Sequence, residues 1–185
     1  MGYGIAAAKG ITGGRRAYKG ALLEGGIGVP FIARWPGKVA AGKVDKTAIL
    51  SAVDLLPTFC ELADVKLPKN YKPDGVSQVK ALMGKGSSLR EKPLFWKIGA
   101  AWPPRPTKPD HWVSFAVVHR QWKLVTNAKG DHLELFDLVK DPLEKNDLKD
   151  KNPKAVKELS QLLEEWKATL PAKPTGKVFS NLRKK

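Results

Sequence analysis

The segment that most constrains the fold joins a glycine turn to a short apolar run near the start of the chain. Glu24-Gly25-Gly26 is followed by a run from Ile27 to Trp35 with little alternation of polar and apolar residues. Such a run is typical of a strand buried on both faces of a sheet. The two glycines indicate a turn that needs a positive φ or a close approach of backbone segments. The sequence therefore predicts a tight turn that leads into a central strand.

A short helix is expected next. Asp54 can cap it, and Pro57 falls in its first turn, where no helical N–H partner is lost. Four apolar side chains then share one face of this helix, namely Leu55, Leu56, Phe59 and Leu62. The stretch from Lys66 to Lys72 is rich in proline and lysine, and it is the predicted domain boundary.

The second half of the chain reads as several strands and a final helix. The expected strands are Pro93–Trp96, Val113–Val118, Trp122–Thr126 and Leu133–Leu138. A proline-rich loop, 101–109, separates the first two. Asn152 can cap the helix, Pro153 suits its first position, and Pro171 lies beyond its end. Its apolar stripe consists of Val156, Leu159, Leu163 and Trp166.

Composition narrows the possible partners. The chain carries 33 Lys and Arg against 18 Asp and Glu, a net charge of +15, which favours anionic partners. The single cysteine, Cys60, excludes an internal disulfide bond. No apolar run reaches the ~20 residues that a spanning helix needs. The first residues also lack the pattern of a signal peptide. No membrane partner is expected.

Eight short segments together resemble the C-terminal part of the sulfatases, including arylsulfatases and N-acetylgalactosamine-6-sulfatases, in the alkaline-phosphatase superfamily. In chain order they are Lys19 with Glu24-Gly25-Gly26; Arg34-Trp35-Pro36-Gly37; Asp54-Leu55-Leu56-Pro57-Thr58; Asp74-Gly75-Val76-Ser77; Arg90 to Trp96; Trp122-Lys123-Leu124; Leu135-Phe136-Asp137-Leu138; and Asp141-Pro142-Leu143-Glu144 with Asn146 and Leu148. The resemblance covers roughly residues 12–168, and its strength lies in the order of the segments.

The resemblance implies an α/β fold in two parts. Residues 1–70 would end an alkaline-phosphatase-like catalytic domain, and 71–170 would form a small α+β C-terminal domain with about four antiparallel strands and a C-terminal helix. Residues 171–185 form a basic tail. The implied function is that of a sulfatase fragment, a hydrolase of sulfuric ester bonds in sulfated carbohydrates or other sulfate esters. A periplasmic or extracellular location is implied as well.

Lys19 is the one catalytic and substrate-binding residue that the resemblance carries over, as a lysine whose ammonium contacts the sulfate group. The family also implies a formylglycine nucleophile, made from a Cys/Ser-x-Pro-x-Arg motif, and a calcium ion. Cys60 has neither the proline nor the arginine at the required offsets, and nothing before Lys19 contains Asp or Asn. We therefore expect no metal ligands in this chain and no activity of the chain alone. The family usually has an arginine where Gly28 stands, which leaves a local ion pair in question.

Other candidate residues point more weakly to function. Asp110-His111 and Asp131-His132 could bind a metal, but no third ligand is spaced to join either pair. His119 could touch substrate, although a hairpin turn explains it as well. Trp102 and Trp112 could stack on a sugar, and ordinary packing is the alternative.

Two further function classes remain open at this stage. The chain could be a noncatalytic carbohydrate- or polyanion-binding module of sulfatase origin. A basic nucleic-acid-binding protein is the weaker alternative, because the lysines are scattered and no nucleic-acid-binding motif accompanies them. Glu24 is likewise open to two interpretations, bonding to backbone amides or exposure to solvent.

Overall fold

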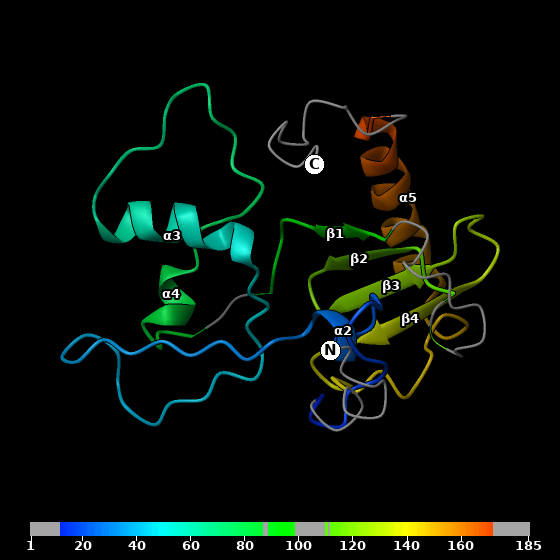
Figure 1. The fold of residues 1–185 in the computed structure, drawn as a ribbon, viewed down its shortest axis with the longest axis horizontal. Coiled ribbons are helices and arrows are strands. Elements are labelled where there is room, and N and C mark those ends of the chain that lie inside the picture. Colours follow the sequence, from blue (N-terminus) through cyan, green and yellow to red (C-terminus); the bar gives the residue numbers. More distant parts are fainter. Residues whose placement is uncertain (1–11, 87–88, 99–109, 111, 172–185) are drawn as a thin grey trace, which may run out of the picture.

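The computed structural model describes residues 12–86, 89–98, 110 and 112–171. Within them it contains four short helical segments, a four-stranded sheet and one long helix (Figure 1). In chain order these elements are α2 (Glu24–Ile27), a 3-10 turn η1 (Ala52–Asp54), α3 (Leu55–Leu62), α4 (Val79–Leu82), β1 (Leu94–Lys97), β2 (Phe115–His119), β3 (Trp122–Thr126), β4 (Leu133–Asp137) and α5 (Pro153–Thr169).

The sheet is an antiparallel meander in the order β1-β2-β3-β4. Val117 faces Leu124, and Leu124 in turn faces Leu135, so the same face of three strands carries apolar side chains. Arg120 has a φ of 54° and lies with Gln121 in the two-residue turn between β2 and β3. The four predicted strands and the predicted final helix are confirmed, with end positions shifted by at most a few residues.

Helix α5 covers one face of the sheet. Leu159 and Leu163 are each 1% exposed and pack with Leu124 and other side chains of the central strands. Trp166 stacks on Phe95 of β1, with ring centroids 5.0 Å apart. The predicted apolar stripe is therefore the contact surface of the helix. The Asn152 side chain does not cap it; its amide donates to the Leu148 carbonyl instead.

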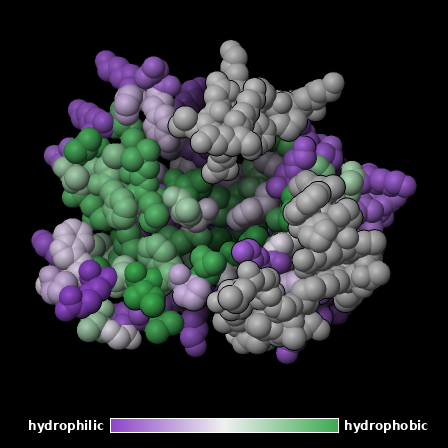
Figure 2. All heavy atoms as spheres, in the orientation of Figure 1, coloured by the Kyte–Doolittle hydropathy of each residue, from purple (hydrophilic) through white to green (hydrophobic). Residues whose placement is uncertain are grey.

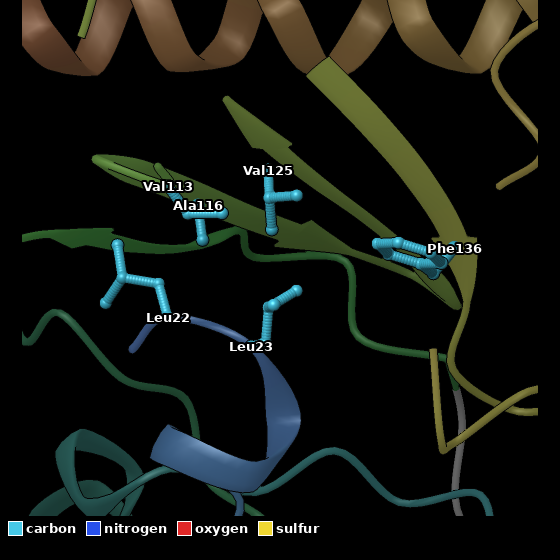
Figure 3. Packing of buried hydrophobic residues seen from close by; sticks show 6 residues of the cluster. All are labelled: Leu22, Leu23, Val113, Ala116, Val125 and Phe136. Carbon is cyan, nitrogen blue, oxygen red and sulfur yellow. The ribbon is translucent and has the colours of Figure 1, made fainter. Parts of the chain in front are cut away.

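The other face of the sheet is covered by the segment that precedes α2. Leu22 and Leu23 pack there on Ala116, Val125 and Phe136, which come from β2, β3 and β4 (Figure 3). Because a strand alternates its side chains between two faces, a sheet covered on both sides buries nearly every residue of its central strands. Four of the five residues in β2 and four of the five in β3 are indeed buried.

The prediction of a buried strand over Ile27–Trp35 is wrong. Residue 27 ends α2, and residues 28–35 form no strand. Val29 is 77% exposed and Ile32 is 90% exposed. A strand needs a neighbouring strand for its backbone hydrogen bonds, and no described residue pairs with this segment. The apolar composition of residues 27–35 therefore indicates a segment that favours burial, and no described part of the chain buries it.

Helix α3 is confirmed, but the face predicted for its apolar stripe is not buried. Leu56 and Phe59 are half exposed, whereas Pro57 and Thr58 are buried. Figure 2 shows a broad hydrophobic area on the side of the molecule where Figure 1 draws α3 and α4. The part of the chain that precedes β1 thus presents apolar surface to solvent.

A loop after β4 is fastened back to the sheet by Asp147. Its carboxylate accepts from the Leu135 amide at 3.0 Å and from the Lys149 amide at 3.1 Å, and it pairs with the Lys149 ammonium at 3.0 Å. Partial burial opposes ionisation, but these hydrogen bonds and the ammonium outweigh it and lower the pKa of Asp147. None of the described helices combines the length and the apolar character required to cross a bilayer.

Leu163→Ala is expected to destabilise the fold by about 2–5 kcal/mol, because it leaves a cavity between α5 and the sheet. Urea denaturation followed by circular dichroism measures this change. Leu162→Ala, one position along the same helix and only partly buried, is the matched control and should cost clearly less. Equal losses in the two variants would contradict the packing described here.

Asp147 should make stability depend on pH at the acid end. Its pKa is lower in the folded than in the unfolded chain, so its contribution is present above the unfolded value of about 3.9. That contribution is lost as the pH falls through the folded pKa. We expect Asp147→Asn to be less stable than the unmodified chain at pH 7, by about 1 kcal/mol. The difference should shrink below about pH 4, and a constant difference from pH 7 to pH 2 would contradict this.

Candidate functional site

Lys19 lies at the apex of a tight turn. The Ala21 amide donates to the Tyr18 carbonyl at 3.1 Å, and Gly20 has a φ of 93°. This positive φ at the third position is the feature that a type II turn requires of glycine. Tyr18 and Ala21 are buried, whereas Lys19 is exposed. Within the described ranges no carboxylate lies within ion-pair distance of its ammonium. The turn therefore projects from a buried base a cation that has no ion-pair partner among the residues that the structure describes.

The residues that follow the turn fix it to the sheet. Leu23 is fully buried against β3 and β4 (Figure 3). A Cβ added to Gly25 would overlap the Ala17 carbonyl, and one added to Gly26 would overlap the Ala21 carbonyl. Neither glycine has a positive φ. The predicted close backbone approach is thus confirmed as the reason for this glycine pair, and the alternative of a positive φ is wrong.

Arg16 ties the residues before the turn to β4, on the face of the sheet that Leu22 and Leu23 cover. Its guanidinium lies 2.9 Å from the Asp110 carboxylate and 2.5 Å from that of Glu134 on β4. Partial burial works against the charge, but Glu134 and Asp110 outweigh it and raise the pKa of Arg16. Asp110, a possible metal ligand by sequence, is therefore engaged in an ion pair.

A buried lysine and two glutamates form the central charged cluster of the site. The Lys123 ammonium, fully buried on β3, donates to Glu24 Oε1 at 2.8 Å and lies 2.8 Å from Glu144 Oε1. The other Glu144 oxygen accepts from the Glu24 amide at 2.6 Å. The sequence left two interpretations of Glu24 open, bonding to backbone amides or exposure to solvent, and neither describes this arrangement. The Glu24 carboxylate binds the Lys123 side chain, and the Glu24 amide donates to Glu144.

Burial dominates the ionisation of Glu144. Its side chain has no exposed surface, and this burial raises its pKa even though Lys123 and the Glu24 amide favour the charged form. Glu144 also has a φ of 55°. A non-glycine residue in this conformation costs of order 1 kcal/mol or more and persists only where the surroundings fix it.

The surroundings of Gly28 leave no room for a larger residue. A Cβ there would stand 2.7 Å from an Arg15 guanidinium nitrogen and 2.8 Å from Glu24 Oε2. The space in which a side chain at position 28 would begin is therefore already occupied. An arginine at this position would require Arg15 or Glu24 to move.

A second buried ion pair lies in the part of the chain that contains α3. Two Arg90 nitrogens donate to the two Asp54 oxygens at 2.7 and 2.9 Å, and both side chains are almost fully buried. Asp54 also accepts from the amides of Ser51 and Val76. The prediction that the Asp54 side chain caps α3 is wrong, because its oxygens serve Arg90 and these two amides. A Cβ on Gly75 would overlap the Val53 carbonyl, which explains the glycine.

These contacts connect six of the eight segments. Glu24, Lys123 and Glu144 come from three of them and meet in one cluster, and Asp54, Val76 and Arg90 come from three more and meet in another. The five charged side chains in these two clusters are therefore structural. Lys19, which belongs to the same segment as Glu24, is exposed and takes part in neither cluster, so it remains the catalytic candidate.

A shallow hollow with a volume of about 340 Å³ lies beside the first cluster. It is lined by Gly14, Arg16, Leu143, Glu144 and Lys145. Lys19 is not among its lining residues, so this hollow does not by itself define a substrate site around the lysine.

The weaker candidates have structural partners. His119 Nδ1 lies 2.9 Å from Glu158 Oε1 on α5, and Asp131 accepts from the Asn127 side chain. Trp112 lies against His132, with ring centroids 4.0 Å apart, and packs on the buried cluster of Figure 3. His111 and Trp102 lie outside the described residues. In the part of the chain that the structure describes, no three His, Cys, Asp or Glu side chains are grouped as a metal site.

Comparison with known proteins gives a consistent result. Residues 16–169 match the family described as N-sulphoglucosamine sulphohydrolase, C-terminal. The chain is 30% identical over 166 residues to an N-acetylgalactosamine-6-O-sulfatase of Bacteroides thetaiotaomicron, covering 82% of this chain and 30% of that protein.

Two solved structures share the fold over most of the chain. One, from work on the metabolism of multiple glycosaminoglycans by Bacteroides thetaiotaomicron, has a TM-score of 0.62 and 30% identity and covers 84% of this chain and 32% of its own. The other, Ps i-CgsB in complex with k-i-k-neocarrahexaose, has a TM-score of 0.64 and 26% identity and covers 82% and 31%. The chain therefore spans about a third of the length of these proteins.

Arg90→Leu is expected to destabilise the fold by about 3–5 kcal/mol, because it leaves the Asp54 carboxylate buried without a counter-charge. Arg120→Leu is the matched control, since Arg120 pairs with Glu91 on the surface and such pairs contribute about 0–1 kcal/mol. Chemical denaturation of both variants measures the difference. Similar losses would show that Asp54 and Arg90 are not the buried pair described here.

Proposed function

We propose that this chain contributes Lys19 to the hydrolysis of sulfuric esters, because it belongs to the sulfatase family as a C-terminal part of such an enzyme. One observation carries this proposal: the family match includes Lys19, and the structure presents this lysine, exposed and unpaired among the described residues, on a turn fixed by a buried cluster. The nucleophile and the metal ion of the family's reaction are not attributed to residues of this chain.

The chemistry of the lysine fits this role. An ammonium is a compact charge with three donors on a flexible stem, so it can follow the negative charge that develops on the sulfate and on the leaving oxygen. The carboxylate nearest in the sequence, Glu24, is held by Lys123 and does not neutralise it. Lys19 would bind the sulfate group and stabilise the transition state for cleavage of the ester bond.

Sulfated carbohydrate is the substrate class that we propose. One relative is named for its action on N-acetylgalactosamine-6-O-sulfate groups, and a structure with the same fold holds a neocarrahexaose. The net charge of +15 would attract a polyanionic sugar chain. A periplasmic or extracellular location, typical of sulfatases, is part of the same proposal.

Calcium and formylglycine are the groups that the family implies, and the residues of this chain do not fit either. No described cluster could hold a metal ion. Cys60 is followed by Glu61, Leu62 and Ala63, so it lacks the proline of the formylglycine motif. The role proposed here is therefore confined to Lys19 and the turn that carries it.

We expect the purified 185-residue chain not to hydrolyse p-nitrophenyl sulfate, because it has no residue motif for the nucleophile. Release of p-nitrophenol, followed by absorbance against a buffer blank, checks this. Turnover above the blank would contradict this expectation, and its loss in Cys60→Ala would identify Cys60 as the nucleophile.

In a full-length sulfatase that contains this segment, Lys19→Ala should lower kcat by about 10²–10³, the effect of removing one donor to a developing anion. Lys129→Ala is the matched control, because Lys129 is also exposed in a turn and lies at the β3–β4 loop. Steady-state kinetics on a sulfated monosaccharide measures both variants. Equal activity of the two would remove Lys19 from the reaction.

A further inference from the structure

The Lys19 turn is fixed by charges that come from distant parts of the chain. Lys123 Nζ holds the Glu24 side chain, and Glu144 Oε2 holds the Glu24 amide. Glu24 is thus bonded through both its side chain and its backbone, five positions from Lys19 in the sequence. Since Lys123 and Glu144 are both fully buried, these two bonds are shielded from water and from salt.

The backbone on both sides of the cluster is held in costly conformations. Ala17 has a φ of 63° and Glu144 a φ of 55°, and neither is a glycine. The Ala17 carbonyl lies against Gly25, which leaves no room for a side chain there. Strain of this kind is retained where the surrounding contacts over-determine the geometry. The turn is therefore held more rigidly than an exposed loop normally is.

The cluster also gives the Glu24 carboxylate its buried counter-charge. Without Lys123, this carboxylate would lose that partner and would turn toward solvent, where Arg15 stands close to it: a Cβ on Gly28 would lie 2.7 Å from an Arg15 guanidinium nitrogen and 2.8 Å from Glu24 Oε2. The loss of Lys123 would therefore release the side-chain contact that holds Glu24 in place.

We propose that Lys123, together with Glu144, is a positioning residue that fixes the Lys19 turn through Glu24. This inference rests on the proposed function of Lys19 for its catalytic meaning. Lys123 is fully buried, so it acts through Glu24, and it determines where the exposed ammonium of Lys19 stands.

The test is amide hydrogen exchange on the intact chain, read at Gly25, whose amide donates to the Arg16 carbonyl at 2.7 Å. In Lys123→Met, exchange at Gly25 should rise at least about tenfold more than exchange at Leu135 in the sheet, because the turn opens locally. Leu124→Ala is the matched control, since Leu124 is buried on the same strand but packs toward α5. It should raise exchange at both positions by a similar factor.

A uniform rise at Gly25 and Leu135 in Lys123→Met would overturn the proposal, because it would show a general loss of stability only. If Lys123→Met does not fold, Glu24→Gln decides the question, since it keeps the shape of the side chain and removes the charge that Lys123 holds. We expect it to raise exchange at Gly25 alone by about threefold or more. Unchanged exchange in that variant would also overturn the proposal.

Kinetics separates this inference from the proposed function. In a full-length sulfatase with this segment, Lys123→Met should lower kcat, because the Lys19 turn loses the contact that holds Glu24. If exchange changes as expected but activity does not, positioning holds and the catalytic role of Lys19 fails. If activity falls while exchange rises uniformly, positioning fails and the role of Lys19 is unaffected.

Discussion

The structure depends on burying charges only in matched sets. Lys123 is fully buried, which is costly for an ammonium unless carboxylates surround it, and Glu24 and Glu144 do so at 2.8 Å. Arg90 and Asp54 solve the same problem with a bidentate pair. In each case the partners come from separate segments, so the requirement for neutralisation adds to apolar packing in holding these segments together.

The second half of the fold was predictable because its signals are local. The apolar periods of the strands and the stripe of Leu159 and Leu163 are complete within short windows of sequence, and both faces of the sheet are covered by described residues. The strand predicted over Ile27–Trp35 is absent because an apolar run indicates that a segment favours burial, but it does not show that a partner strand is present. In the described residues nothing covers it, and it lies as exposed chain.

The site was predictable only in part, for a related reason. The order of the eight segments pointed to Lys19 and to the glycine turn, but it could not distinguish catalytic from structural residues. Lys123 reads as an ordinary strand residue, and its burial became visible only when Glu24 and Glu144 were seen on either side of it. A signal was present in the sequence: a lysine between Trp122 and the apolar pair Leu124-Val125, in a predicted strand, needs a buried counter-charge.

The separations along the chain also set an order of assembly. Strands β1 to β4 pair only with their neighbours in sequence, whereas the Glu24–Lys123 bond spans 99 positions and the Glu24–Glu144 bond spans 120. Closing such long loops is entropically costly and is repaid only once the opposing surface exists. The hairpins can therefore form first and serve as a template, and the segment around Lys19 docks onto them late. The region that carries Lys19 is then also the one whose folding lags behind the rest of the domain.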